Sequence, residues 1–527
     1  MALPEEIIMS KNIMIQGTMS SAGKSLMVAG ILRVLKQDGY RVAPFKSQNM
    51  ALNSYITSEG LEMGRAQVMQ AEAAGIEPKV CMNPILLKPT SDVGSQVIVH
   101  GRVRGNYNAS AYFRLKQSLI PEIMEAYRSL EKEADIIVIE GAGSPAEINL
   151  KADDIVNMGL AQLVDAPVLL VGDIDRGGVF AQLLGTVLLL EEKERARIKG
   201  FIINKFRGDE KLLAPGPEML RQRCGIETVG VMPYLPLQIE DEDSLSGQLT
   251  YREEVKPIRI AVVRLPHLSN FTDFNPLVRF AAVSLQYVDK VTQLERMGLP
   301  DLLILPGSKN TLQDLKWLRE SGMEAAILQR AALGCRILGV CGGYQMLGER
   351  ITDASGVEGG GSMQGLSLLP VQTVFREEKK RTRIAGRITL GRGEDAGREN
   401  REGGTGRANR WEKLRGLRVE GYEIHMGESM AYGDGQPFCL LEDGRMDGCV
   451  QNRVLGTYLH GIFEDSQFLL TLLLLLCEDR ELSPEILYAS DAAPSYQAYK
   501  ESQYDMLADA VRRHLDMERI YEIIEGA

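Results

Sequence analysis

A cysteine between glycines follows an apolar run in the second half of the chain. Residues 337–340 read Ile-Leu-Gly-Val, Cys341 comes next, and Gly342 and Gly343 lead into an amphipathic stretch. Flanking glycines allow a buried strand to turn sharply into a helix with a nucleophile at the turn. The start of such a helix favours the reactive thiolate form. A buried cysteine at a strand end is the alternative.

His460 supports the first interpretation. It follows the apolar run 454–459 and precedes Gly461, so it ends a predicted strand, 119 residues after Cys341. A histidine close to a cysteine can take its proton and later activate water. The two residues therefore predict covalent catalysis with Cys341 as nucleophile and His460 as base. The histidines show no zinc-ligand spacing.

Residues 17–25 read Gly-Thr-Met-Ser-Ser-Ala-Gly-Lys-Ser, between a short buried strand and an apolar-periodic helix that reaches about residue 35. Strand, Gly-Lys-Ser loop and helix in this order predict a phosphate-binding loop. Backbone N–H groups cradle the phosphates, Lys24 supplies a positive charge and Ser25 can ligate Mg²⁺. The usual first glycine position holds Thr18. The expected phosphate contacts here are Gly17, Thr18, Ser20, Gly23, Lys24 and Ser25.

Two charged residues end neighbouring predicted strands in this half. Glu140 ends the apolar run 136–139 and is followed by Gly-Ala-Gly, which suits a Mg²⁺ ligand opposite Ser25 or a simple turn. Lys46 ends the run 41–45 and is a candidate phosphate contact or a solvated lysine. In α/β sheets ligands bind beyond the carboxyl ends of the strands, which gives both positions functional weight.

Polar residues also follow two later strands. Asp173, Asp175 and Arg176 come after the run 167–171, at the start of a helix, and are candidates for a substrate or synthetase site or for a local cap and ion pair. Asn204 follows the run 199–203 and is a candidate nucleotide contact.

The second half contains two further candidate positions near the cysteine. Pro306 and Gly307 follow the predicted strand that comes just before the nucleophile strand in the chain. Backbone N–H groups at this turn, together with that of Gly342, could stabilise an oxyanion. An ordinary strand-to-helix turn is the alternative. His425 ends another strand-like run and is a candidate ligand contact or a structural histidine.

Strand-like and helical stretches alternate through both halves. The first half shows strand-like runs near 12–17, 41–45, 136–139, 167–171, 199–203 and 228–232. Such alternation predicts parallel sheets covered on both faces. We expect a nucleotide-binding domain at 1–235, an acidic linker at 236–256, a second α/β domain at 257–470 with a mobile charged loop at about 390–412, and a helical segment at 471–527.

Composition limits the class of protein. At 527 residues the chain exceeds a single core, and acidic residues outnumber basic ones by 11, which argues against nucleic acid as the main partner. Seven dispersed cysteines fit reduced thiols rather than disulfides. No apolar run reaches the length of a membrane span and no signal pattern begins the chain, so a cytoplasmic location is expected.

The motifs together resemble the cobyric acid synthase family of glutamine-dependent amidotransferases of cobalamin biosynthesis, over nearly the full chain. The matching stretches are 17–25, 46–50, 140–149, 173–180, 204–208, 305–311, 339–347, 421–427 and 460–461. This resemblance implies an N-terminal domain similar to dethiobiotin synthetase, with a shifted phosphate loop, and a C-terminal domain similar to class I glutamine amidotransferases.

The implied reaction is ATP- and Mg²⁺-dependent amidation of the b, d, e and g carboxylates of adenosylcobyrinic acid a,c-diamide, with L-glutamine as nitrogen donor. Position 462, where class I amidotransferases usually carry a glutamate, holds Ile462. The alternatives are the related enzyme that amidates the a and c carboxylates, and a nucleotide switch joined to an inactive amidotransferase-like binding module. Intact Cys341 and His460 argue against the inactive module.

Overall fold

The computed structural model describes residues 10–91, 94–239, 251, 254–390, 410–488 and 495–526. The chain forms two compact units: unit 1 comprises residues 1–57, 61–242 and 500–527, and unit 2 comprises residues 58–60 and 243–499. The expected segment 471–527 is therefore divided between the units. Most of the expected linker 236–256 and most of the expected charged loop 390–412 lie outside the described residues.

Unit 1 is built on a six-stranded parallel sheet with the order β12-β11-β10-β1-β9-β2. All six strands coincide with the runs expected from the sequence. They are β1 (Lys11–Gly17), β2 (Val42–Phe45), β9 (Ile136–Glu140), β10 (Val168–Asp173), β11 (Ile198–Phe206) and β12 (Thr228–Pro233). The phosphate loop, Glu140 and Asp173 follow or end three adjacent strands, so the sheet gathers them at its carboxyl edge.

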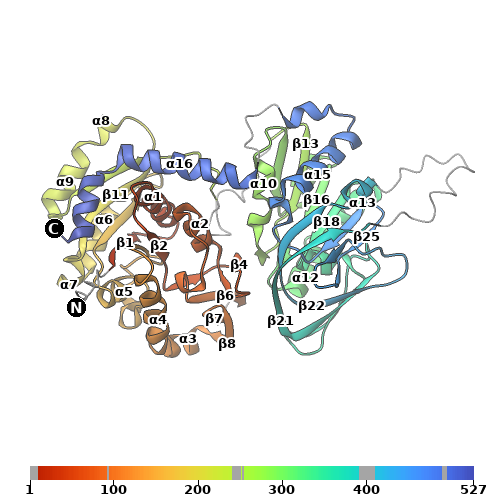
Figure 1. The fold of residues 1–527 in the computed structure, drawn as a ribbon, viewed down its shortest axis with the longest axis horizontal. Helices are drawn as coiled ribbons and strands as arrows, with labels where there is room; N and C mark the ends of the chain where they lie inside the picture. Colours follow the sequence, from red (N-terminus) through yellow and green to blue (C-terminus); the bar gives the residue numbers. More distant parts are fainter. Residues whose placement is uncertain are drawn as a thin grey trace, which may run out of the picture. The chain divides into compact units, whose positions relative to one another are not determined.

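Helices cover both faces of this sheet, which explains its nearly continuous apolar strands (Figure 1). Alternate residues of β1 point to opposite faces. Met14 joins a core with α4 (Ile120–Glu131) and α6 (Val179–Leu189), whereas Ile13 and Ile15 join a core with α1 (Lys24–Gln37).

The last two helices, α16 (Tyr496–His514) and α17 (Met517–Glu525), complete the core on the α1 face. Gly30 of α1 allows close packing, because a Cβ there would lie 2.7 Å from Val511 Cγ2. Arg33 on the same helix forms ion pairs with Glu501 and Asp505. The C-terminal residues are thus part of the core of unit 1.

Between β2 and β9 the structure contains strands that the sequence patterns did not predict. A four-stranded sheet has the order β3-β6-β7-β8, and β4 pairs with β5. The strands are β3 (Gln48–Met50), β4 (Ser54–Ile56), β5 (Glu62–Gly64), β6 (Ile85–Ser91), β7 (Gly94–Val99) and β8 (Arg102–Asn108). Helix α2 (Arg65–Ala74) follows β5.

Unit 2 has a second six-stranded sheet, with the order β15-β13-β16-β18-β26-β25. All neighbours are parallel except β25 and β26. The strands are β13 (Ile258–Val263), β15 (Val283–Val288), β16 (Leu302–Leu305), β18 (Arg336–Val340), β25 (Cys449–Gln451) and β26 (Val454–Thr457). Because β18 and β26 are parallel neighbours, Cys341 and His460, which follow them, both lie at the carboxyl edge of this sheet.

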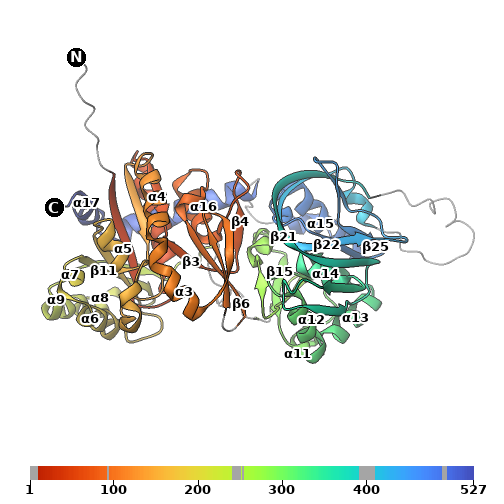
Figure 2. The same cartoon turned by 90° about the horizontal axis from the view of Figure 1, so that it is seen from below.

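Helices α12 (Thr311–Glu320), α13 (Met323–Ala332), α14 (Gly342–Leu347) and α15 (Ser466–Asp479) contribute to the core of unit 2. A long antiparallel ribbon of β21 (Val371–Ile388) and β22 (Arg418–Ala431) forms part of another sheet (Figure 2). The two-domain α/β class expected from the sequence is confirmed. Within the described ranges, no helix is both long and apolar enough to cross a membrane.

Candidate active sites

Cys341 occupies the sharp turn between β18 and α14 that the glycine pattern predicts. Its φ of 52° and ψ of −108° are rare for a residue with a side chain. The glycines are needed for space: a Cβ on Gly343 would lie 2.0 Å from Leu305 O, and one on Gly342 would lie 2.8 Å from Ser308 N. The backbone N–H of Cys341 donates to Thr457 O at 2.8 Å, which fixes the turn against β26.

His460 lies beside the cysteine, as expected. It follows β26, its side chain is 1% exposed, and Cys341 is near enough to help raise the pKa of its imidazole. Tyr422 of β22 stacks on the imidazole at 5.2 Å between ring centroids. The geometry therefore brings a thiol and a general base into direct contact.

The other edge of the imidazole contacts a carboxylate that the sequence interpretation missed. Asp273, on η5 (Phe271–Phe274), has Oδ2 at 2.6 Å from His460 Nδ1. Its Oδ1 accepts from Gly461 N at 3.3 Å. No motif in the sequence marked this aspartate, which precedes the histidine by 187 residues.

The Gly307 turn also lies at this site. A Cβ on Gly307 would lie 3.1 Å from His460 Cε1. Asp314 holds the turn, because it accepts from Ser308 Oγ at 2.6 Å and is 2.7 Å from His267 Nδ1. The backbone of residues 307 and 308 is therefore close to both Cys341 and His460, where N–H groups can face a developing oxyanion.

His425 belongs to unit 2 and lies among aromatic and polar groups rather than with the candidates of unit 1. Its ring stacks on Tyr458 with centroids 3.8 Å apart, and Nδ1 is 2.6 Å from Gly427 O. The Tyr458 hydroxyl accepts from Gln345 Nε2 at 3.1 Å. The Cys341 thiol donates to Ile424 O, next to His425 in the chain, so this histidine is near the same site.

In unit 1 the phosphate loop has the strand-loop-helix form expected. Gly23 adopts φ 99° before α1, and Lys24 Nζ donates to Met19 O at 3.1 Å and Gly143 O at 3.3 Å. Asn204 braces the loop by donating to Ala22 O at 2.9 Å. Thr18 bonds to Gln182, and Ser20 is exposed.

Glu140 is the centre of a buried polar cluster, and its side chain is fully buried. Ser25 Oγ and Lys46 Nζ each lie 2.9 Å from Oε1. Gln70 and Gln67 of α2 approach Oε2. Lys46 therefore contacts Glu140 directly, and the two glutamines are site residues that the sequence interpretation did not identify.

Ser25 Oγ and Glu140 Oε1, which share a hydrogen bond of 2.9 Å, are oxygen ligands of the kind that Mg²⁺ takes. Among the described residues, Gln70 Oε1 is a buried oxygen without a hydrogen-bond partner in the same cluster. Ser25 and Glu140 would hold the metal.

The acids at and just after the end of β10 are paired with basic residues at and just after the end of β11. Asp173 lies 2.8 Å from Lys205 Nζ, which also donates to Ser21 O of the phosphate loop at 2.7 Å. Asp175 is 3.0 Å from Arg207, while Arg176 is 4.0 Å from Asp173. Lys205 thus links β10 to the phosphate loop. It belongs to the stretch 204–208 that matches the family, but the sequence analysis assigned no role to this lysine.

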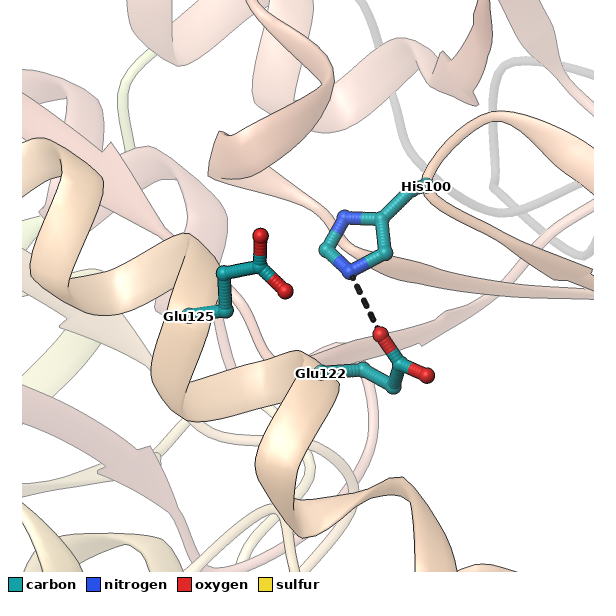
Figure 3. Close-up of side chains that lie close together, drawn as sticks. All are labelled: His100, Glu122 and Glu125. Carbon is teal, nitrogen blue, oxygen red and sulfur yellow. Dashed lines mark hydrogen bonds and ion pairs between the residues drawn. The ribbon is translucent and has the colours of Figure 1, made fainter.

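Unit 1 contains a further cluster of titratable side chains. His100, at the turn between β7 and β8, bonds to Glu122 of α4 at 3.2 Å, with Glu125 nearby (Figure 3). The group is partly exposed. His100 Nε2 already has Glu122 as its hydrogen-bond partner, so we assign no ligand to this cluster.

Comparison with known proteins matches both units. Residues 13–245 match the CobQ/CobB/MinD/ParA nucleotide binding domain family, and residues 259–468 match the CobB/CobQ-like glutamine amidotransferase domain family. The cobyric acid synthase of Lachnoclostridium phytofermentans is 56% identical, with 98% of this chain and 99% of that protein covered. That of Ruminiclostridium cellulolyticum is 52% identical, with 98% of each chain covered.

The chain belongs to the cobyric acid synthase family. It is a glutamine amidotransferase ligase, as the motifs predicted. The family's two domains account for the two sites, since the nucleotide-binding match covers Lys24 and Glu140 and the amidotransferase match covers Cys341 and His460. Asp273 also lies within the amidotransferase match.

Proposed function

We propose that the protein amidates the b, d, e and g carboxylates of adenosylcobyrinic acid a,c-diamide, using ATP and L-glutamine, to give adenosylcobyric acid in cobalamin biosynthesis. The observation that carries this proposal is the pairing, in one chain of this family, of a buried Cys341–His460 couple with a phosphate loop in which Lys24 contacts Gly143 O and Ser25 contacts Glu140. One site releases ammonia and the other activates a carboxylate.

In the glutaminase step, His460 accepts the thiol proton of Cys341, and the sulfur attacks the side-chain amide carbon of glutamine. The tetrahedral oxyanion faces backbone N–H groups at Gly307 and Gly342. His460 then protonates the departing nitrogen, and ammonia leaves a thioester on Cys341. Water, deprotonated by His460, releases glutamate and restores the thiol.

In the synthetase step, a substrate carboxylate oxygen attacks the γ-phosphorus of ATP, and ADP leaves. The product is an acyl phosphate, a far better electrophile than a carboxylate. Ammonia attacks its carbonyl carbon and inorganic phosphate departs, which leaves the amide. Lys24 neutralises charge on the transferring phosphoryl group. Mg²⁺, held by Ser25 and Glu140, would supply further charge neutralisation and orient the phosphates.

The test is a mass spectrum of the product formed from adenosylcobyrinic acid a,c-diamide, ATP-Mg and amide-¹⁵N glutamine. Four labelled amides per corrinoid are expected, with one ADP for each. No mass change would contradict the proposed substrate. If the protein instead amidates the a and c positions of cobyrinic acid in a parallel assay, it is the related diamide synthase.

A further inference from the structure

A buried carboxylate contacts the catalytic imidazole on the edge opposite Cys341. The side chains of Asp273 and His460 are 6% and 1% exposed, and the Oδ2–Nδ1 distance is 2.6 Å. A charge-assisted hydrogen bond that is shielded from water in this way is strong and directional. The position two residues after the histidine cannot supply it, because Ile462 is apolar and buried.

We propose that Asp273 is the positioning residue of the glutaminase. Its carboxylate accepts a hydrogen bond from Nδ1–H of His460 and so directs Nε2 toward Cys341. The inference rests on the glutaminase half of the proposed function. An imidazole has two nitrogens, so with Nδ1 committed to Asp273 only Nε2 remains to exchange a proton with Cys341. That is the nitrogen that must accept the thiol proton.

The carboxylate also stabilises the ring after it has accepted the proton. Burial lowers the pKa of His460, but the Asp273 carboxylate and the contact with Cys341 outweigh burial and raise the pKa to about 10. Because this value exceeds the ordinary 6.5, the ring keeps the proton that it takes from the thiol at neutral pH, which favours a pair of Cys341 thiolate and His460 imidazolium, and this stabilisation is lost as pH rises toward 10.

The segment that carries Asp273 is itself held in place. Asn270 adopts φ 52° and donates through Nδ2 to the Tyr422 hydroxyl at 2.7 Å, while the Tyr422 ring stacks on His460. Tyr287 donates to Phe271 O at 3.1 Å. The titratable groups around the imidazole are therefore Asp273 from η5, Cys341 from the elbow and Tyr422 from β22, and Asp273 alone among these three is a carboxylate.

The decisive variant is Asp273→Asn, which keeps the volume but lets an amide N–H favour the wrong imidazole tautomer. We expect glutaminase kcat to fall roughly 100-fold or more, with little change in KM. Alkylation of Cys341 by iodoacetamide should slow at neutral pH and its pH profile should move upward. Ammonia-dependent amidation should persist, which separates this result from a failure of the proposed substrate. Asp273→Glu should restore part of the glutaminase rate.

Asp301→Asn is the matched control. Asp301 is also a buried carboxylate of unit 2 (side chain 4% exposed), but it precedes β16 and accepts from Arg259 N at 2.7 Å. We expect this change to alter stability without moving the alkylation profile. Wild-type glutaminase rate and alkylation profile in Asp273→Asn would overturn the proposal.

A measurement on the unmodified protein keeps the inference testable if Asp273→Asn does not fold. In protein labelled with ¹⁵N-histidine, the ring whose NMR signals are missing from the His460→Ala variant identifies His460. We expect its Nδ1 to carry a proton throughout the neutral range. A neutral ring protonated on Nε2 alone would exclude the proposed role of Asp273.

Discussion

Cys341 combines a reactive side chain with a strained backbone. A non-glycine residue at φ 52° and ψ −108° is destabilised by roughly 1–3 kcal/mol and persists only where its surroundings enforce it. The bond from its N–H to Thr457 O and that from Gln345 N to its own carbonyl provide such enforcement. Alanine retains the Cβ, so Cys341→Ala removes the thiol with little change in this strain.

Cys341→Ala should abolish glutaminase and glutamine-dependent amidation, because no other group replaces the nucleophile. Amidation with ammonium salts should remain close to wild type, since Lys24 and Glu140 belong to unit 1. Both rates can be followed by ADP release and product mass. Loss of the ammonia-dependent rate in a folded variant would show that the two activities are not separable in this way.

His460→Ala should lower the glutaminase rate by roughly 100-fold or more, the usual contribution of a general base. Steady-state glutamate formation measures it, and ammonia-dependent amidation serves as the internal control. Near-normal kinetics would point to another base, and His425 would be the next candidate because it lies close to Cys341 through Ile424.

Cys341 and His460 were predictable at this scale because each ends an apolar run and is followed by glycine. Asp273 was not, since it occurs 187 residues before its partner in an irregular segment. Only the fold brings η5 to the end of β26. Gln67 and Gln70 were missed for a related reason: a glutamine on a buried helix gives no signal until its partner, Glu140, is located.

At the scale of elements, Glu140 shows how four segments build the proposed synthetase site. The acid ends β9, Ser25 begins α1, Lys46 follows β2, and the glutamines come from α2. The strand ends were predictable from apolar runs. The inserted strands β3 to β8 were not, because several are only three residues long and do not alternate regularly.

Lys24→Ala or Glu140→Ala should remove amidation with either nitrogen source, because each takes away charge that the phosphoryl transfer needs. Basal glutaminase should survive in both. With substrate carrying ¹⁸O in its carboxylates, wild-type protein should transfer the label into inorganic phosphate. AMP and pyrophosphate as products, or phosphate without label, would contradict the acyl-phosphate route.

At the scale of the whole molecule, unit 1 is discontinuous in sequence. The sequence pattern of residues 471–527 predicted helices. An amphipathic helix does not show which domain its apolar face packs against, so the sequence did not predict that residues 500–527 pack in unit 1. These helices bury Leu507, Val511, Ile520 and Ile523 at 3% exposure or less. Each such side chain contributes roughly 1.5–3 kcal/mol, and a typical domain has only about 5–15 kcal/mol in total.

Deleting residues 500–527 should therefore unfold unit 1 and abolish ammonia-dependent amidation. Limited proteolysis and circular dichroism measure the folding, and glutaminase activity reports on unit 2, which should remain active. Arg513→Ala is a matched control, because this side chain is exposed on the same helix. A truncated protein that retains ammonia-dependent amidation would show that unit 1 is stable without these helices.

The discontinuity also matters during synthesis on the ribosome. Residues 1–242 emerge first, but the helices that cover Ile13, Ile15 and α1 come after residues 243–499. At roughly 5–20 residues per second, translating these intervening residues, 257 in number, takes roughly 13 to 50 seconds. For that time the core on the α1 face of the first sheet is incomplete, which makes the nascent chain a natural client for chaperones.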